Sequence, residues 1–196
     1  MYNRTENYQS DCSYISQIKA FKDNVSIKSC LSYTFSVSNS QGTSLIKDRP
    51  FTAEMTRSIM LLKEKPYRPR MADYRIGVFF TGREQLGEGA KTTAPVYYAN
   101  RWDIQPSDTA AYLRGEKVKP TKQIVFYIDN TFPEKWKPYL REGVTQWNEL
   151  FEQIGFKDVV AAKDFPTDDP EFDPDNIKYS CVRYAPSSIE NAMGPS

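Results

Sequence analysis

The chain has 196 residues, and its 26 basic and 25 acidic side chains give a formal net charge of only +1. Apolar residues make up 39 % of the sequence and aromatic residues 14 %, which is enough to fill a packed core. No long run of one charge sign favours nucleic acid or an anionic membrane as a partner. The sequence also lacks the roughly 20 consecutive apolar residues of a membrane-spanning helix and a signal-like start, so we expect neither a membrane span nor a targeting signal.

Histidine is absent from the sequence. This absence excludes a Ser-His-Asp triad, a Cys-His pair, an HExxH helix and a three-histidine zinc site built from these residues alone. The three cysteines, Cys12, Cys30 and Cys181, form no CxxC pair. The sequence therefore favours ordinary thiols over a zinc knuckle or a disulfide framework.

The first half of the chain is predicted to be mostly strand. Residues 1–13 are polar, and we expect them to form a flexible N-terminus. Residues 14–105 hold short alternating or β-branched runs separated by turn residues, which predict a β-rich region of about four to six strands. The clearest runs are 25–27, 31–37, 51–60 and 75–80.

Residues 106–122 are predicted to form a connector with one short helix. Pro106, Ser107 and Asp108 resemble a helix cap, and the helix would run through Leu113 with Gly115 closing it. The apolar run 123–129 (QIVFYID) then predicts a strand that is buried on both faces.

The clearest helical pattern follows this strand, with apolar residues in steps of four, three, four and three at Leu140, Val144, Trp147, Phe151 and Ile154. Pro138 fits the first helical position and Gly155 fits the stop. Trp147 on this face and Trp136 beside the helix entry are both predicted to lie in the core.

Further strands are predicted at 159–162 and 177–184. The order strand, helix, strand, strand describes half of an α/β domain, with its first two strands parallel and its helix packed across the sheet.

Six carboxylates lie in the loop 164–176 (DFPTDDPEFDPDN): Asp164, Asp168, Asp169, Glu171, Asp173 and Asp175. Carboxylate oxygens are suitable ligands for calcium. Proline and aspartate are also turn-forming residues, however, and the loop lacks the glycine and the terminal glutamate of an EF-hand. The sequence therefore favours a solvated turn loop over a calcium site.

A second cluster, residues 65–74 (KPYRPRMADY), combines basic and aromatic side chains that could contact nucleic acid. Its prolines instead favour an extended strap between elements, in which Arg68, Arg70 or Arg75 pairs with Asp73 or another carboxylate.

Two segments carry a resemblance to a known family. Residues 124–164 (IVFYIDNTFPEKWKPYLREGVTQWNELFEQIGFKDVVAAKD) and 168–195 (DDPEFDPDNIKYSCVRYAPSSIENAMGP) resemble the zinc-dependent metalloproteases of Bacteroidetes that carry a reprolysin-like catalytic domain. The earlier segments AFKDNVSIKSCLSYTF, MTRSIMLL, and YRPRMADYRIGVFF followed by RWDIQPSD resemble the β-rich region of unknown function that precedes this catalytic domain.

The resemblance implies an α+β chain: a β-rich N-terminal region followed, at 123–196, by the incomplete N-terminal half of a metzincin-like α/β domain. In that half, a mixed sheet would be backed by one long helix. Residues 191–195 fall where such enzymes place their substrate-lining edge strand, so Ala192, Met193 and Gly194 are the candidates for substrate contact through backbone hydrogen bonds. A frayed terminus is the alternative interpretation.

Such enzymes carry the zinc motif HExxHxxGxxH after this edge strand, and the motif is absent from this chain. We therefore expect an N-terminal fragment without a cofactor of its own, inactive alone, arising from an engineered truncation, a split gene or natural cleavage. Zinc, peptide or protein substrates and a periplasmic, outer-membrane-associated or secreted location would belong to the parent enzyme. The alternative is a non-catalytic peptide-binding or interaction module, and an exposed sheet edge would also allow two copies to pair.

Overall fold

The computed structural model describes residues 2–64, 68–87, 92–187 and 192–194. The chain divides into two compact units, and each is described by itself. Unit 1 comprises residues 1–62 with 166–180, and unit 2 comprises residues 63–165 with 181–196. Strands predominate over helices, so the fold is β-rich and of the α+β class, as the sequence predicted.

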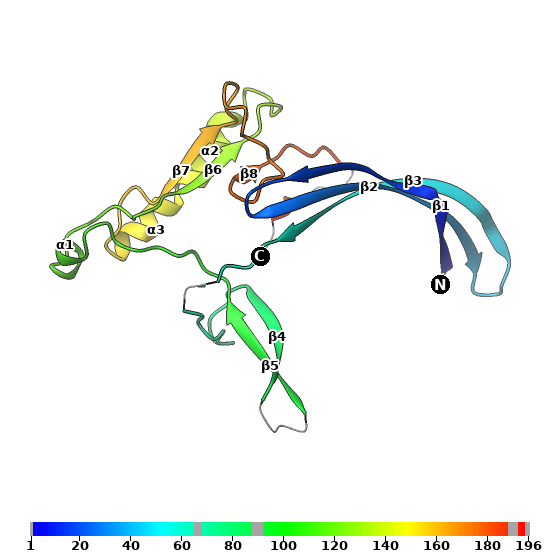
Figure 1. Ribbon diagram of the computed structural model, residues 1–196, viewed down its shortest axis with the longest axis horizontal. Coiled ribbons are helices and arrows are strands. Elements are labelled where there is room, and N and C mark those ends of the chain that lie inside the picture. The colour runs from blue at the N-terminus through cyan, green and yellow to red at the C-terminus, as the bar shows by residue number, and fades with distance from the viewer. Residues whose placement is uncertain (1, 65–67, 88–91, 188–191, 195–196) are drawn as a thin grey trace. The chain divides into compact units, whose positions relative to one another are not determined.

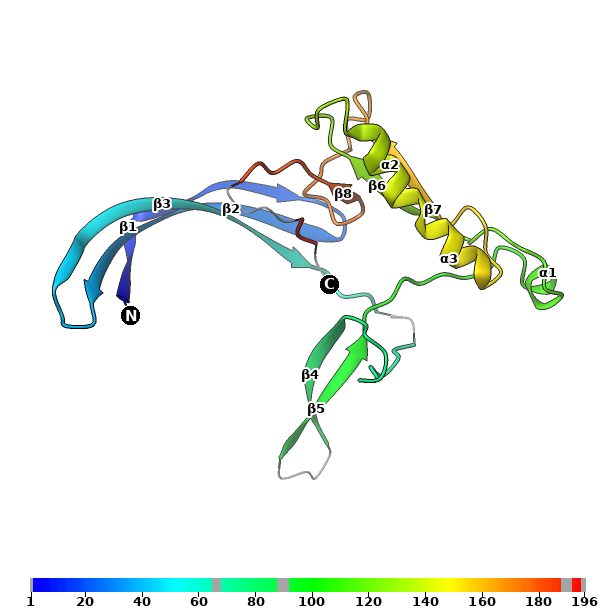
Figure 2. The same cartoon turned by 180° about the vertical axis from the view of Figure 1, so that it is seen from behind.

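The helices and strands can be followed along the chain in Figure 1 and from behind in Figure 2. The strands are β1 (Tyr2–Ala20), β2 (Asn24–Asn39), β3 (Ser44–Met60), β4 (Phe80–Leu86), β5 (Thr93–Ala99), β6 (Ile124–Ile128), β7 (Val160–Asp164) and β8 (Ser180–Val182). The helices are α1 (Thr109–Leu113), α2 (Lys137–Thr145) and α3 (Trp147–Gln153).

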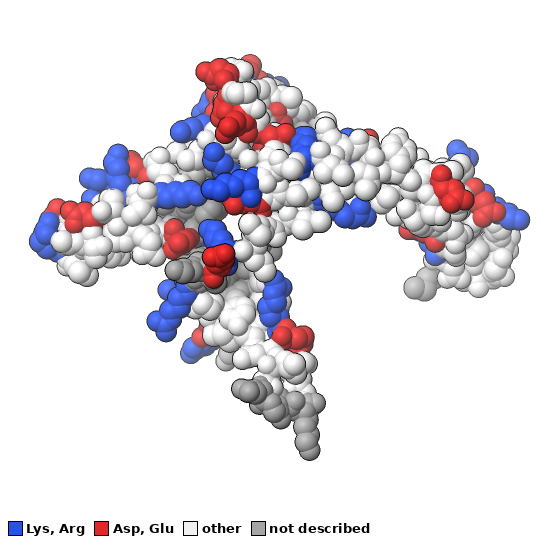
Figure 3. All heavy atoms as spheres, viewed as in Figure 1, with Lys and Arg blue, Asp and Glu red and all other residues white. Residues whose placement is uncertain are grey.

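Unit 1 is built on a long antiparallel sheet with the order β1-β2-β3, and both views show it bent along its length (Figures 1 and 2). Side chains alternate between the two faces of a strand, so the odd-numbered residues of β2 form an apolar face. Tyr8, Tyr33 and Phe51 lie directly opposite one another on this face, with ring centroids 5.4 and 5.3 Å apart. In Figure 3 the drawn side of β1, β2 and β3 is mostly uncharged.

The observed strand bounds correct three predictions. The runs 25–27 and 31–37 belong to one strand, β2, and 75–80 contributes only Phe80 to a strand. Most of the expected flexible segment 1–13 lies in β1. Its polar composition did not predict a strand because the backbone partners lie in β2, and a bulge is accommodated where the Ser32 N–H donates to Ser13 Oγ at 3.0 Å.

The core of unit 2 lies around a small sheet with the order β7-β6-β8. β6 and β7 are parallel, as predicted, and Ile128 and Val159 have no exposed surface. The short helix α1 begins as expected, because Asp108 Oδ1 accepts the Ala111 N–H at 2.9 Å. In the described part of the chain, no helix is long and apolar enough to cross a membrane.

The predicted single long helix is instead two helices, α2 and α3, which meet at Gln146. Just before that residue, Thr145 Oγ1 donates to the carbonyl oxygen of Arg141 at 2.9 Å, a bond that competes with regular helical geometry. Trp147 is 58 % exposed and Trp136 is 44 % exposed, so the prediction that both tryptophans are core residues was wrong. Val144 and Phe151 do pack against the core of unit 2.

Candidate functional site

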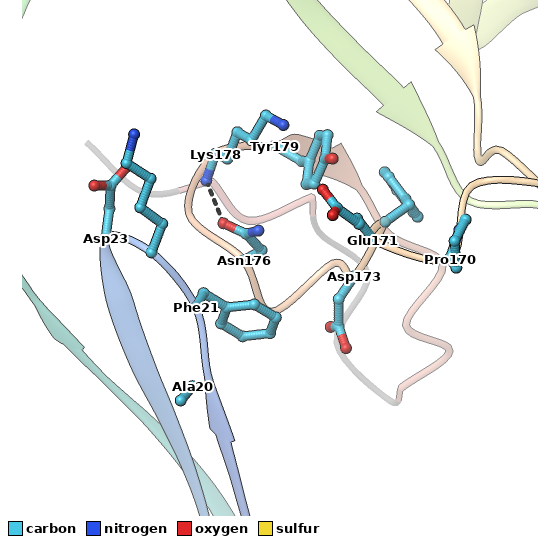
Figure 4. A pocket seen from close by; sticks show the side chains of 11 residues that line it. Ala20, Phe21, Asp23, Pro170, Glu171, Asp173, Asn176, Lys178 and Tyr179 are labelled. Carbon is cyan, nitrogen blue, oxygen red and sulfur yellow. Dashed lines mark hydrogen bonds between the residues drawn. The ribbon is translucent and has the colours of Figure 1, made fainter.

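A hollow of about 680 Å³ lies in unit 1, between the turn that joins β1 to β2 and the acidic loop 166–180 (Figure 4). Phe21 and Lys22 line it from the turn, and Glu171, Phe172 and Tyr179 line it from the loop. The hollow therefore includes the acidic segment that the sequence analysis identified, together with a turn that is far away in the sequence.

Lys19 fixes the loop electrostatically. Its Nζ lies 2.9 Å from Asp173 Oδ2 and 2.7 Å from Asp175 Oδ2, and all three side chains are half-buried. The hydrogen bond to Asp175, followed by that to Asp173, raises the pKa of Lys19. Two of the six carboxylates thus neutralise a lysine of the sheet.

Asn24 fixes the same loop through its side-chain amide, which is only 3 % exposed. Its Nδ2 donates to the carbonyl oxygen of Asp175 at 3.0 Å and to Ser58 Oγ at 2.9 Å. Its Oδ1 accepts the Ile177 N–H at 3.2 Å. The sequence analysis did not identify Asn24, because no local pattern connects it to a loop about 150 residues later.

Short polar side chains of the loop also accept hydrogen bonds from nearby backbone N–H groups and so stabilise its turns. Asp169 Oδ1 accepts the Glu171 N–H at 2.9 Å, and Asn176 Oδ1 accepts the Lys178 N–H at 3.0 Å, the bond that is dashed in Figure 4. The predicted turn chemistry is therefore confirmed. Across the described residues, no group of three or more His, Cys, Asp or Glu side chains could hold a metal ion.

The remaining residues that line the hollow include aromatic side chains and side chains of both charges. The rings of Phe172 and Tyr179 are 4.8 Å apart, and Lys178 Nζ lies 5.1 Å from the Tyr179 ring centroid. The Tyr179 side chain, followed by the carboxylates of Glu171 and Asp169, raises the pKa of Lys178. Such a lining can bind polar groups and rings, and the eleven lining residues include no serine, cysteine or histidine that would serve as a nucleophile or base.

The predicted substrate-contact residues lie in unit 2. Ala192, Met193 and Gly194 are exposed and belong to no helix or strand. Residues 188–191 and 195–196 are outside the described part of the chain, so the proposed edge strand at 191–195 can be followed only at its centre. Substrate contact at these three residues stays a prediction.

Of the pairings predicted for this arginine-rich segment, that of Arg75 with Asp73 is confirmed. Arg75 Nε donates to Asp73 Oδ1 at 2.9 Å, and the hydrogen bonds from Arg75 lower the pKa of Asp73. Residues 65–67 of the same segment lie outside the described residues.

Two polar side chains of unit 2 form hydrogen bonds that the sequence analysis did not predict. Asn148 Oδ1 accepts the N–H groups of Val159 and Val160 at 2.9 and 2.8 Å, which fixes the start of β7. Asp129, 9 % exposed and immediately after β6, accepts from Thr131 N–H and Oγ1 at 2.9 and 2.8 Å. Burial alone would raise the pKa of Asp129, but these hydrogen bonds and the nearby Arg183 outweigh it and lower the pKa.

The architecture is thus that of a β-rich α+β chain whose second unit contains the small three-stranded sheet β7-β6-β8. Residues 1–107 match the family described as a domain of unknown function, DUF5117, and the chain belongs to this family. The matched region ends immediately before Asp108, the cap of α1. No curated protein and no solved structure matches the chain.

Proposed function

We propose that this chain is a non-catalytic N-terminal portion of a zinc-dependent metallopeptidase that hydrolyses peptide bonds. The observation that supports the proposal best is the arrangement of β6, α2, α3 and β7. The residues that resemble such enzymes form a parallel strand pair, β6 and β7, joined by a helical crossover. β8 lies on the other side of β6.

These residues do not form a zinc site by themselves. The chain has no histidine, and the described residues hold no group of three metal-ligating side chains. The chain's own contribution would be structural: a small sheet packed around the buried Ile128 and Val159, with Ala192, Met193 and Gly194 near the peptide substrate. Zinc and the general base would come from other sequence of the parent, which we place in the periplasm, at the outer membrane or outside the cell.

The test is to read the source gene beyond the codon for residue 196 and to express both the present chain and any longer product. We expect the longer product to contain HExxHxxGxxH, to hold about one zinc per chain by elemental analysis, and to cleave a quenched fluorescent peptide. Replacement of the motif glutamate by glutamine is the control, because it should retain zinc and abolish cleavage. A longer product that binds zinc without cleaving peptides, or a reading frame without the motif, would refute the proposal.

A specific observation favours the alternative of a non-catalytic interaction module. The apolar face of the β1-β2-β3 sheet exposes Ile15, Ile18 and Ile59 by 59, 61 and 62 %. Exposed apolar patches of this kind mark interaction surfaces. A stop codon at the end of this chain in the source gene, together with binding of a protein partner, would support this alternative over the peptidase.

A further inference from the structure

We propose that the outer edge of β3, at residues 52–58, binds an extended segment of another polypeptide as a fourth strand of the sheet, with an acidic side chain beside Arg57. This inference does not depend on the proposed peptidase function, because it concerns only unit 1.

One hydrogen bond and the register show which N–H and C=O groups of β3 point away from β2. The Leu61 N–H donates to the Asp23 carbonyl oxygen at 2.9 Å, so this pair is of the hydrogen-bonded kind. Asn24 then faces Met60, and the register continues without a shift to Phe35 opposite Arg49. Because hydrogen-bonded and non-bonded pairs alternate, the even-numbered residues of β3 direct their N–H and C=O groups away from β2.

Pro50 agrees with this assignment, since it lacks an N–H and occupies an even position opposite Thr34. The outward groups available for pairing are therefore those of Thr52, Glu54, Thr56 and Ser58. Within the described residues the sheet order ends at β3, and no strand pairs with this edge.

The register between β2 and β3 runs without a shift from Met60 to Arg49, the longest such run in this sheet. Beyond Pro50 the edge is broken at Asp48, which has a φ of +46° beside a register shift. On the opposite side of the sheet, the pairing of β1 is interrupted between Gln9 and Tyr14 and again between Ile15 and Gln17. Bulges and prolines protect sheet edges against pairing, and residues 52–58 of β3 contain neither.

The side chains along this edge specify the chemistry of the partner. Ala53, Met55 and Ile59 continue the apolar face, and Met55 and Ile59 are 43 and 62 % exposed. On the other face Glu54 already pairs with Lys28 at 2.8 Å. Arg57, on the apolar face, donates from Nη1 to Ser29 Oγ at 3.4 Å, and none of the ion pairs of the described residues includes it. A partner with apolar residues at alternate positions and one carboxylate opposite Arg57 would complement this edge.

A second copy of the chain does not supply that carboxylate at the same edge. Two copies related by a two-fold axis perpendicular to the sheet would place odd-numbered β3 residues opposite odd-numbered ones. The odd positions from 49 to 59 are Arg49, Phe51, Ala53, Met55, Arg57 and Ile59, and none is acidic. Self-pairing would leave Arg57 opposite an apolar residue or another arginine, so the edge favours a different sequence.

The experiment measures binding of a fluorescently labelled, end-blocked peptide of about seven residues to the full chain by anisotropy. The peptide alternates valine and threonine, with one aspartate at a central valine position. Thr56→Pro should weaken binding at least about tenfold, because it removes an outward N–H and obstructs the edge. Thr56→Val is the matched control and should bind as the parent does. Pro50 shows that the strand tolerates proline at an outward position, and far-UV circular dichroism would verify folding of both variants.

The role of Arg57 has its own comparison. Arg57→Gln should weaken binding of the aspartate peptide by about threefold and leave a matched asparagine peptide unaffected. Equal binding by the parent and Thr56→Pro would overturn the proposal. Dimerisation of the parent that Thr56→Pro abolishes, without peptide binding, would overturn it in favour of a second copy. Zinc content and peptide cleavage are separate measurements, so failure here is distinguishable from failure of the peptidase proposal.

Discussion

Asn24 and Asp175 are joined by a hydrogen bond across 151 positions of sequence, from Asn24 Nδ2 to the Asp175 carbonyl oxygen at 3.0 Å. Asn24 is the first residue of β2, so the start of a strand determines where the acidic loop lies. The loop is therefore part of the sheet unit, although the intervening chain forms another unit.

Asn24→Ala should destabilise unit 1 by about 1–3 kcal/mol, because it leaves the Asp175 carbonyl and the Ile177 N–H without their buried partner. Urea denaturation would measure the loss, and hydrogen exchange should show faster exchange in residues 169–179. Asn7→Ala, on an exposed position of β1, is the matched control and should change stability by less than about 0.5 kcal/mol. Equal effects of the two substitutions would contradict the role of Asn24.

Lys19→Met should lower stability at neutral pH by about 1–2 kcal/mol, because two half-buried carboxylates lose their partner. Asp175 and Asp173 raise the pKa of Lys19 in the folded chain, so this contribution is complete below the ordinary lysine pKa of 10.5 and is lost as pH rises through the raised value. The difference in unfolding free energy between the parent and Lys19→Met should therefore shrink at alkaline pH. A difference that stays constant up to about pH 12 would contradict the assignment.

Gly155→Ala and Gly143→Ala should have opposite effects. Gly155 has a φ of +87°, and an added Cβ would lie 2.9 Å from the Tyr112 ring, so alanine there should destabilise by about 2 kcal/mol or more. Gly143 lies inside α2 with open space around it, and alanine should stabilise the helix by about 0.5–1 kcal/mol. Thermal melts of both variants test the pair; a stabilised Gly155→Ala variant would be the contrary result.

Asp129→Asn should flatten the acid dependence of stability. The pKa of Asp129 is lowered in the folded chain, so the carboxylate contributes above its ordinary value of 3.8, and this contribution is lost as pH falls through the lowered value. The asparagine variant keeps an acceptor for Thr131 but does not titrate. Melting temperatures of the two proteins from neutral pH to about pH 2 should therefore converge as the pH falls; parallel curves would exclude Asp129 as a contributor.

Elements with local signals could be predicted from the sequence. Helix α1 was predicted from the cap-like residues 106–108, strand β6 from its apolar run, and the start of α2 from Pro138, which occupies its first turn. These features depend on residues within one or two turns of one another, so the sequence contains the whole signal.

Features that depend on distant partners could not be predicted. The polar residues of β1 form a strand only because β2 supplies their hydrogen bonds, and Lys19 holds the loop only because Asp173 and Asp175 return to it. The hollow at this loop could therefore not be predicted from the sequence, although the turns within the loop were predicted correctly.

The ion pair of Lys19 with Asp173 also determines when unit 1 can be completed during synthesis. The two residues are 154 positions apart, so the three-stranded sheet emerges long before its loop. Asp173 follows the end of β3, Met60, by 113 residues, so at about 5–20 residues per second the sheet would wait on the order of 6–23 seconds for this segment. During that interval the buried amide of Asn24 is exposed to water and the β1–β2 turn is uncovered. Completion of the first unit thus follows the synthesis of residues 63–165 of the second unit.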